Sequence, residues 1–199
     1  THDFTLGPCA DLPDREAAGG HVDGTPGGAL VFMDFLQTVV KPAISDRFPV
    51  CKDAETLFGH SLGGYFVLQA LVSEPASYAN FVAVSPSIWW GREQLFDAAA
   101  RAFGRREATP PSSPSVFLYT GEYEEALAPW QFGKEGNEQV LLRRQQRAMI
   151  QNAESFTRHL RSASESKVRA THQCFPGEDH ASVLSVAINH ALREVLAPH

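Results

Sequence analysis

The chain has 199 residues, 43% of them hydrophobic and 20% charged, which suits one folded domain with a sizeable core and excludes a disordered tail. Its net charge of -6 gives no basic footprint for general nucleic-acid binding, and no apolar stretch approaches the roughly 18 residues of a membrane span. The three cysteines form no CxxC pair, which excludes a disulfide-dense scaffold and a cysteine zinc site. We therefore expect neither nucleic acid nor membrane as a partner, no cofactor and no metal.

A single α/β domain spanning residues 1–199 is predicted from the order of apolar segments. Residues 1–28 are rich in Gly, Asp and Pro and are expected to form one long loop. Strands are expected at Glu55–Phe58, Phe81–Val84, Val116–Tyr119 and Val168–Phe175. Helices are expected at about 28–45 with a kink near Pro42, at Tyr65–Val72, Glu93–Phe103, about 138–163, and Ala181–Val195. This alternation predicts a mostly parallel sheet flanked by helices.

A candidate nucleophile stands at the junction of the first predicted strand and the buried helix after it. Gly59-His60-Ser61-Leu62-Gly63 fits the pattern G-x-S-x-G, in which glycines let a serine occupy a strained turn above a sheet. The backbone N–H of Leu62, at the start of the helix, can donate to a developing oxyanion. The strand before and the helix after make this pattern far more specific than the five letters alone.

A nucleophilic serine needs a base and an acid from later in the chain. Among eight histidines, His180 follows a strand and a Pro-Gly turn and opens a helix, so it is expected at the carboxyl edge of the sheet. The acid is predicted to follow the third strand, where Glu122, Glu124 and Glu125 all stand. We select Glu124, with Glu122 as the alternative and a serine–histidine dyad as a further one.

These motifs together resemble a known family. The serine turn continuing to Gly64, the loop Ser85-Pro86-Ser87-Ile88-Trp89-Trp90, the segment Gly121-Glu122-Tyr123-Glu124 and His180 are similar to the putative-esterase (esterase D-like) family of α/β hydrolases. The nearest branch is the enterobactin-esterase-like enzymes, which hydrolyse siderophore esters. The resemblance covers nearly the whole chain and implies an α/β-hydrolase fold, Ser61 as nucleophile and His180 as base.

Further residues are candidates for substrate contact. Trp89 and Trp90 follow the second strand, where they could stack on flat rings of a substrate, although one of two adjacent aromatic residues often belongs to the core. His60, beside the serine, is expected to support the turn and to border the substrate. Arginines 143, 144 and 147 could attract an anionic ferric complex or form an ordinary solvated helix face.

The resembled fold has several strands before the nucleophile, whereas only Glu55–Phe58 precedes Ser61 here. We therefore expect the amino-terminal strands to be missing from this chain and to be supplied by a second polypeptide, since an apolar sheet edge would otherwise be open. One of the loops after those strands would carry the second oxyanion donor. A cytoplasmic location is favoured over a periplasmic one.

The function expected is that of a serine-dependent carboxylic ester hydrolase that forms an acyl-enzyme on a siderophore or related ester. Two alternatives remain: a non-catalytic protein that binds siderophores on a hydrolase fold, and an acyl esterase with another substrate.

Overall fold

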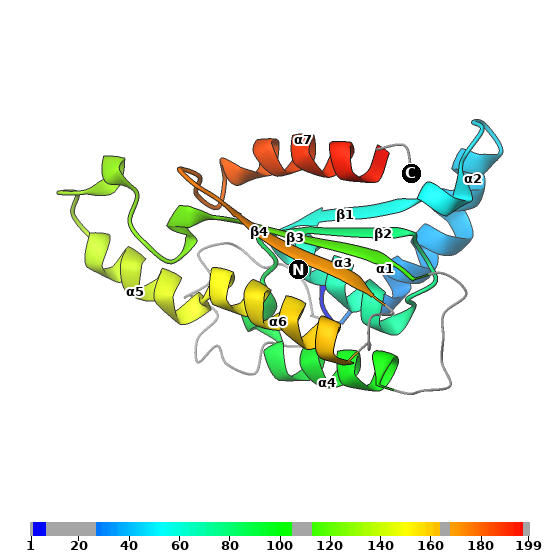
Figure 1. Cartoon of the computed structure of the whole chain (residues 1–199), viewed down its shortest axis with the longest axis horizontal. Coiled ribbons are helices and arrows are strands. Elements are labelled where there is room, and N and C mark those ends of the chain that lie inside the picture. Colours follow the sequence, from blue (N-terminus) through cyan, green and yellow to red (C-terminus); the bar gives the residue numbers. More distant parts are fainter. Residues whose placement is uncertain (1, 7–26, 105–112, 164–167, 197–199) are drawn as a thin grey trace.

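The computed structural model describes residues 2–6, 27–104, 113–163 and 168–196. Four parallel strands form one sheet in the order β1-β2-β3-β4 (Figure 1). They comprise β1 (Thr56–His60), β2 (Asn80–Val84), β3 (Ser115–Gly121) and β4 (Arg169–Phe175). Chain order equals spatial order, so each connection moves one strand further across the sheet. The parallel sheet flanked by helices is confirmed, and each strand overlaps its predicted range.

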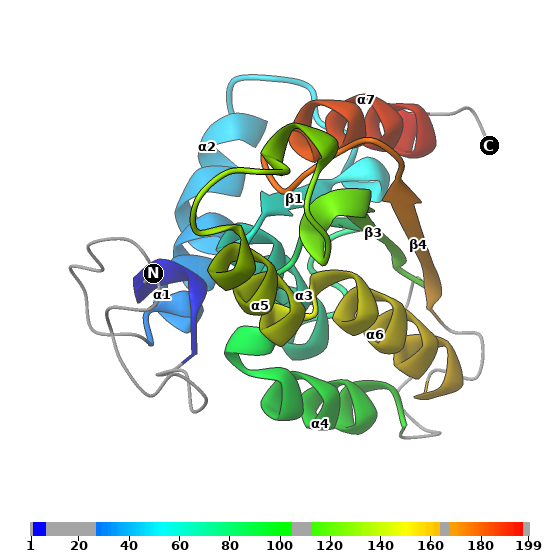
Figure 2. The same ribbon diagram turned by 90° about the vertical axis from the view of Figure 1, so that its left-hand side faces the viewer.

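Helices cover both faces of the sheet, and the two central strands β2 and β3 are therefore buried on both sides. The longer helices are α3 (Leu62–Ser73), α4 (Arg92–Phe103), α5 (Asn137–Arg147), α6 (Met149–Ala163) and α7 (Val183–Leu196). In Figures 1 and 2, α7 lies on one face and α3, α4 and α6 lie on the other. Along β2, Phe81 and Ala83 pack towards α3, whereas Val82 and Val84 pack towards α7. All four side chains are buried, which fits the continuous apolar run in the sequence.

The segment before β1 is helical, but the helix type changes from α to π and back to α. It comprises α1 (Ala29–Phe35), a π-helical turn at Leu36–Val40 and α2 (Lys41–Ser45). Pro42 is the second residue of α2. Because proline has no N–H, it cannot donate a hydrogen bond to the turn before it. The predicted disturbance near this proline therefore takes the form of a π bulge.

The single helix predicted over 138–163 is wrong, because the chain breaks between α5 and α6. Ala148 adopts a left-handed conformation, with φ 43° and ψ 51°. The side chain of Asn152 donates a hydrogen bond to the carbonyl of Arg147 at 3.0 Å, which satisfies an acceptor at the end of α5. The break turns α5 away from α6 and, as shown below, towards the candidate site.

Short helical turns lie in the connections, at His2–Phe4 (η1), Lys52–Ala54 (η4), Ile88–Trp90 (η5), Glu122–Glu124 (η6) and Pro129–Gln131 (η7). The predicted loop over 1–28 falls mostly outside the described residues. Within the part of the chain that is described, no helix is long and apolar enough to cross a bilayer. In that same part β1 is an edge strand, paired with β2 alone.

Candidate active site

The serine turn lies between β1 and α3. Ser61 has φ 59° and ψ -119°, a strained conformation for a residue with a side chain. Gly59 permits this turn because a Cβ atom there would lie 2.2 Å from the carbonyl oxygen of Gly63. The first N–H groups of α3, beginning with Leu62, have no partner within the helix and point towards the same end of the sheet. The local sequence therefore places a hydroxyl beside a helix amino-terminus.

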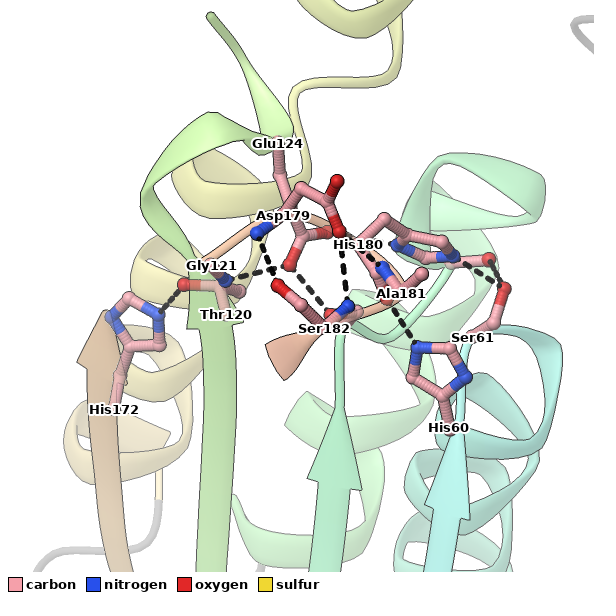
Figure 3. A network of polar contacts seen from close by, with 12 residues as sticks. His60, Ser61, Thr120, Gly121, Glu124, His172, Asp179, His180, Ala181 and Ser182 are labelled. Atoms are coloured by element: carbon pink, nitrogen blue, oxygen red, sulfur yellow. Dashed lines mark hydrogen bonds and ion pairs between the residues drawn. The ribbon is translucent and has the colours of Figure 1, made fainter. Parts of the chain in front are cut away.

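His180 reaches the serine from the connection between β4 and α7. Its Nε2 lies 3.2 Å from Ser61 Oγ (Figure 3). The side chain of Asp179 fixes this connection by accepting hydrogen bonds from the N–H groups of Ala181 and Ser182. These bonds, that from Ser182 first, hold the pKa of Asp179 below its ordinary value. Asp179 is thus part of the local turn that carries His180.

Glu124 meets His180 from the turn after β3. Its Oε2 lies 3.1 Å from His180 Nδ1, and its side chain is fully buried. The other carboxylate oxygen, Oε1, accepts a hydrogen bond from the backbone N–H of Gly121 at 2.7 Å. When Nδ1–H donates to the carboxylate, Nε2 carries the lone pair and can accept the Ser61 proton. The three side chains predicted from the sequence are therefore brought into one hydrogen-bonded series.

The two neighbouring glutamates face elsewhere. Glu122 Oε2 accepts the N–H of Gly177 at 2.7 Å, which ties the turn after β3 to the turn after β4. Glu125 accepts two hydrogen bonds from Gln151 in the first turn of α6. Neither carboxylate contacts His180, so the geometry favours Glu124 among the three candidates.

A cavity of about 260 Å³ opens above the serine. Residues from four connections line it: Ser61, Leu62, Ser87, Trp89, Trp90, Glu124, Arg144, Arg147, Met149 and His180. Trp90 is buried and belongs to the core, whereas Trp89 is partly exposed. Both tryptophans border the cavity, so they lie where substrate contact was predicted.

Two arginines of α5 form one side of this cavity. The guanidinium of Arg147 lies over the ring of Trp89, 4.8 Å from its centre. Burial, and then the neighbouring Arg143, lower the pKa of Arg147 from its ordinary value. Arg144 donates to the carbonyl of Ala126 and, at 2.9 Å, to the side chain of Gln131. Among the described residues, neither arginine forms a salt bridge.

His60 lies beside the site rather than in the cavity wall. Its Nε2–H donates to the backbone carbonyl of His180 at 2.8 Å, and the two rings lie 4.8 Å apart (Figure 3). Burial lowers the pKa of His60, which favours the neutral ring that makes this bond. The predicted support of the turn agrees with this position, but the structure does not bring His60 to the substrate side.

Two serines near the site were not predicted. Ser85 directly follows β2 and donates its hydroxyl to Glu124 Oε1 at 2.6 Å. Ser87 Oγ lies 3.4 Å from Ser61 Oγ. The signal available in the sequence was their position after the second strand, because the carboxyl ends of parallel strands meet at one edge of the sheet. No group of metal-ligating side chains is found in the described residues.

A serine at a strand–turn–helix, followed along the chain by a carboxylate and a histidine after later parallel strands, defines the α/β-hydrolase class. Comparison with known proteins makes this more specific. The family model described as "Putative esterase" matches residues 20–173, and the chain belongs to that family.

Characterised relatives extend the similarity over most of the chain. The siderophore triacetylfusarinine C esterase of Aspergillus fumigatus is 33% identical over 83% of this chain and 57% of its own length. The ferri-bacillibactin esterase BesA of Bacillus subtilis is 31% identical over 98% of this chain and 61% of its own length. Siderophore hydrolase EstA from Aspergillus nidulans superposes with a TM-score of 0.82 at 26% identity, covering 98% of this chain and 65% of that one. The chain thus spans less than two thirds of each relative.

Proposed function

We propose that the protein is a serine-dependent carboxylic ester hydrolase that acts on siderophore esters through an acyl-enzyme. The observation that carries the proposal is the hydrogen-bonded series from Glu124 through His180 to Ser61, which opens into a cavity. Family membership and the names of the relatives support an ester substrate.

The proposed chemistry uses the tautomer of His180 in which Nδ1–H donates to Glu124 and Nε2 is free to accept a proton. His180 Nε2 accepts the proton as Ser61 Oγ attacks the ester carbonyl carbon, and the N–H of Leu62 donates to the oxyanion. His180 then gives that proton to the departing alcohol oxygen, which leaves an acyl group on Ser61. Water, deprotonated by His180, attacks the acyl carbon, and the carboxylic acid departs as the serine regains its proton.

A fluorophosphonate probe tests the nucleophile. The protein should be labelled once, at Ser61, and the Ser61→Ala variant should neither label nor hydrolyse a ferric siderophore ester in a chromatographic assay. Ser185→Ala, which removes an exposed hydroxyl on α7, is the matched control and should behave as the unmodified protein. Quenching of Trp fluorescence by the siderophore, with no hydrolysis and no labelling of the folded protein, would instead support the non-catalytic binding alternative.

We further propose that the substrate carries negative charge near its ester. The support is the wall of Arg144 and Arg147, while the carboxylate in the cavity, that of Glu124, is already engaged by hydrogen-bond donors. Arg147→Gln should raise KM for an anionic ferric tris-catecholate ester about tenfold, as expected for one charge-assisted contact, with little change for a neutral ferric tris-hydroxamate ester. Arg143→Gln is the control, because Arg143 does not line the cavity. Equal effects on both substrates would contradict the charge argument.

We also propose that a parallel strand from outside these residues pairs with the outer edge of β1. The support is the unpaired edge of β1 in the described part of the chain and the exposed side chain of Phe58, 39% accessible, on that strand. Intact mass spectrometry of the purified protein under denaturing conditions should reveal a second polypeptide. A well-folded, monomeric species of 21.8 kDa alone would contradict this proposal.

A further inference from the structure

The residue after β2 is held in an unusual conformation. Ser85 has φ 45°, a left-handed backbone that side-chain residues adopt at an energetic cost, and it is completely buried. Its N–H donates to the carbonyl of Tyr119 on β3 at 2.7 Å, so the neighbouring strand holds this turn in place. Strained residues persist where surrounding contacts determine them, and such positions concentrate at functional sites.

The strained turn directs a hydroxyl at the proposed catalytic acid. Ser85 Oγ lies 2.6 Å from Glu124 Oε1, a distance typical of a hydroxyl donating to a charged carboxylate. Gly121 N–H donates to the same oxygen at 2.7 Å. Oε1 therefore has two donors, and Oε2 remains for His180 Nδ1 at 3.1 Å. This division of the two oxygens fixes the carboxylate plane relative to the imidazole.

Burial makes these donors important. The Glu124 side chain has no solvent exposure, and a buried carboxylate keeps its charge only when hydrogen bonds or opposite charges replace water. Gly121 and Ser85 supply two such bonds from neighbouring strand ends, and the Ser85 hydroxyl is the one that a side-chain substitution can remove.

We propose that Ser85 is a positioning residue for the reaction: its hydroxyl orients Glu124 and stabilises the carboxylate charge, so that His180 presents Nε2 to Ser61. This inference rests on the proposed function, because it assigns a role to Ser85 through the acid and base of that mechanism. Ser85 itself does not line the cavity, so the role proposed for it acts through Glu124.

Loss of this hydroxyl should shift the pH dependence of kcat/KM in one direction, whereas structural damage alone should lower the rate without shifting it. The active form of the pair has a neutral His180 and a charged Glu124, and a proton added to either one inactivates it. A carboxylate with one donor fewer attracts that proton more strongly, so the acid limb of the kcat/KM profile moves to higher pH. The substitution does not alter the other titratable groups that interact with the acid or line the cavity with it, which are His60, His172, Cys174, Arg144 and Arg147.

The test compares pH–rate profiles after active-site titration with a fluorophosphonate, so that only competent molecules are counted. Ser85→Ala should lower kcat about 10- to 100-fold, leave KM within about twofold and shift the acid limb upward by about one pH unit, as one hydrogen bond to a charged group implies. Ser85→Gly removes the hydroxyl and the backbone strain together, and it should show the same kinetic change even if it is the better folded variant. Ser85→Cys, with a weak thiol donor, should fall between Ser85→Ala and the unmodified protein.

Thr157→Val is the matched control for loss of a buried hydroxyl. Thr157 Oγ1 donates to the carbonyl of Ala153 within α6, so this variant should lose some stability but keep the pH profile. If Ser85→Ala and Ser85→Gly retain both rate and pH profile while the unmodified protein labels at Ser61, the role of Ser85 is refuted and the proposed function stands. If the unmodified protein neither labels nor hydrolyses esters, the proposed function itself fails.

Discussion

Replacing Glu124 with glutamine changes one carboxylate oxygen into an amide nitrogen. As a result, Nδ1 of the neighbouring His180 has to accept a hydrogen bond where it now donates one. The carbonyl oxygen of the new amide can take the place of Oε1 and keep the hydrogen bonds from Ser85 and Gly121, at 2.6 and 2.7 Å. The amide nitrogen then faces His180 Nδ1, which lies 3.1 Å from the present carboxylate oxygen. Because an amide N–H only donates, Nδ1 must accept, and the imidazole proton moves to Nε2.

This tautomer is unproductive. Nε2–H would point at Ser61 Oγ, 3.2 Å away, and could no longer take the serine proton. The same carboxylate-to-amide change in a serine-protease triad lowers kcat about 10⁴-fold with the geometry intact, and we expect a similar loss here. That loss corresponds to about 5 kcal/mol of transition-state stabilisation. KM should change little, because the cavity keeps its shape.

Initial rates of ester hydrolysis, followed by chromatography, measure the effect, and Glu122→Gln is the control. Glu122 Oε2 accepts the N–H of Gly177, and an amide oxygen accepts equally well, so this variant should stay within about twofold of the unmodified protein. A Glu124→Gln variant within tenfold of normal activity would refute the tautomer argument. The reverse ranking would assign the acid to Glu122, and equally small losses would indicate a dyad.

Two further predictions concern the serine turn and its neighbour. Gly59→Ala places a Cβ atom 2.2 Å from the backbone oxygen of Gly63, so it should lower the free energy of unfolding by about 3 kcal/mol or more. In Gly63→Ala the new Cβ meets open space, so this variant should raise the free energy of unfolding by about 0.5–1 kcal/mol through its higher helix propensity. Urea unfolding measures both changes. Burial lowers the pKa of His60, so between its ordinary value of 6.5 and the lower folded value the unfolded chain binds more protons. The free energy of unfolding should therefore fall as pH decreases through and below 6.5, and less so in His60→Gln; an identical pH dependence of that variant would contradict this assignment.

The strands and the nucleophile could be predicted because local sequence determines them. The run Phe81–Val84 is apolar at every position since helices cover both faces of the sheet, and the structure begins this strand one residue earlier. Ser61 could be predicted because the turn needs a glycine at position 59, where a Cβ atom would have no room. In both cases the signal lies in residues that are close together in the chain, even where the burial itself comes from distant helices.

The choice of acid and the break between α5 and α6 depend on residues distant in sequence. Glu122 and Glu124 lie in the same turn and differ in the partner of the carboxylate. Glu122 accepts a hydrogen bond from Gly177, and Glu124 accepts one from Ser85. Ala148 is a strong helix former, so propensity favours an unbroken helix there. The break is held instead by hydrogen bonds between helices and loops, such as that from Gln151 to Glu125, which no pattern of apolar residues encodes.

The site thus has two parts: one is held by the ends of the strands, and the other lies on helix α5. The side chains of the proposed catalytic series follow the ends of β1, β3 and β4, where hydrogen bonds between and within the turns hold them. The charged wall belongs to α5, whose buried contacts are few: none of its residues is fully buried, and Arg144 ties it to the loop after η6. Substitutions on α5 can therefore change the substrate wall without moving the strand ends. Changes at Arg144 or Arg147 should consequently appear in KM, whereas changes at Glu124 should appear in kcat.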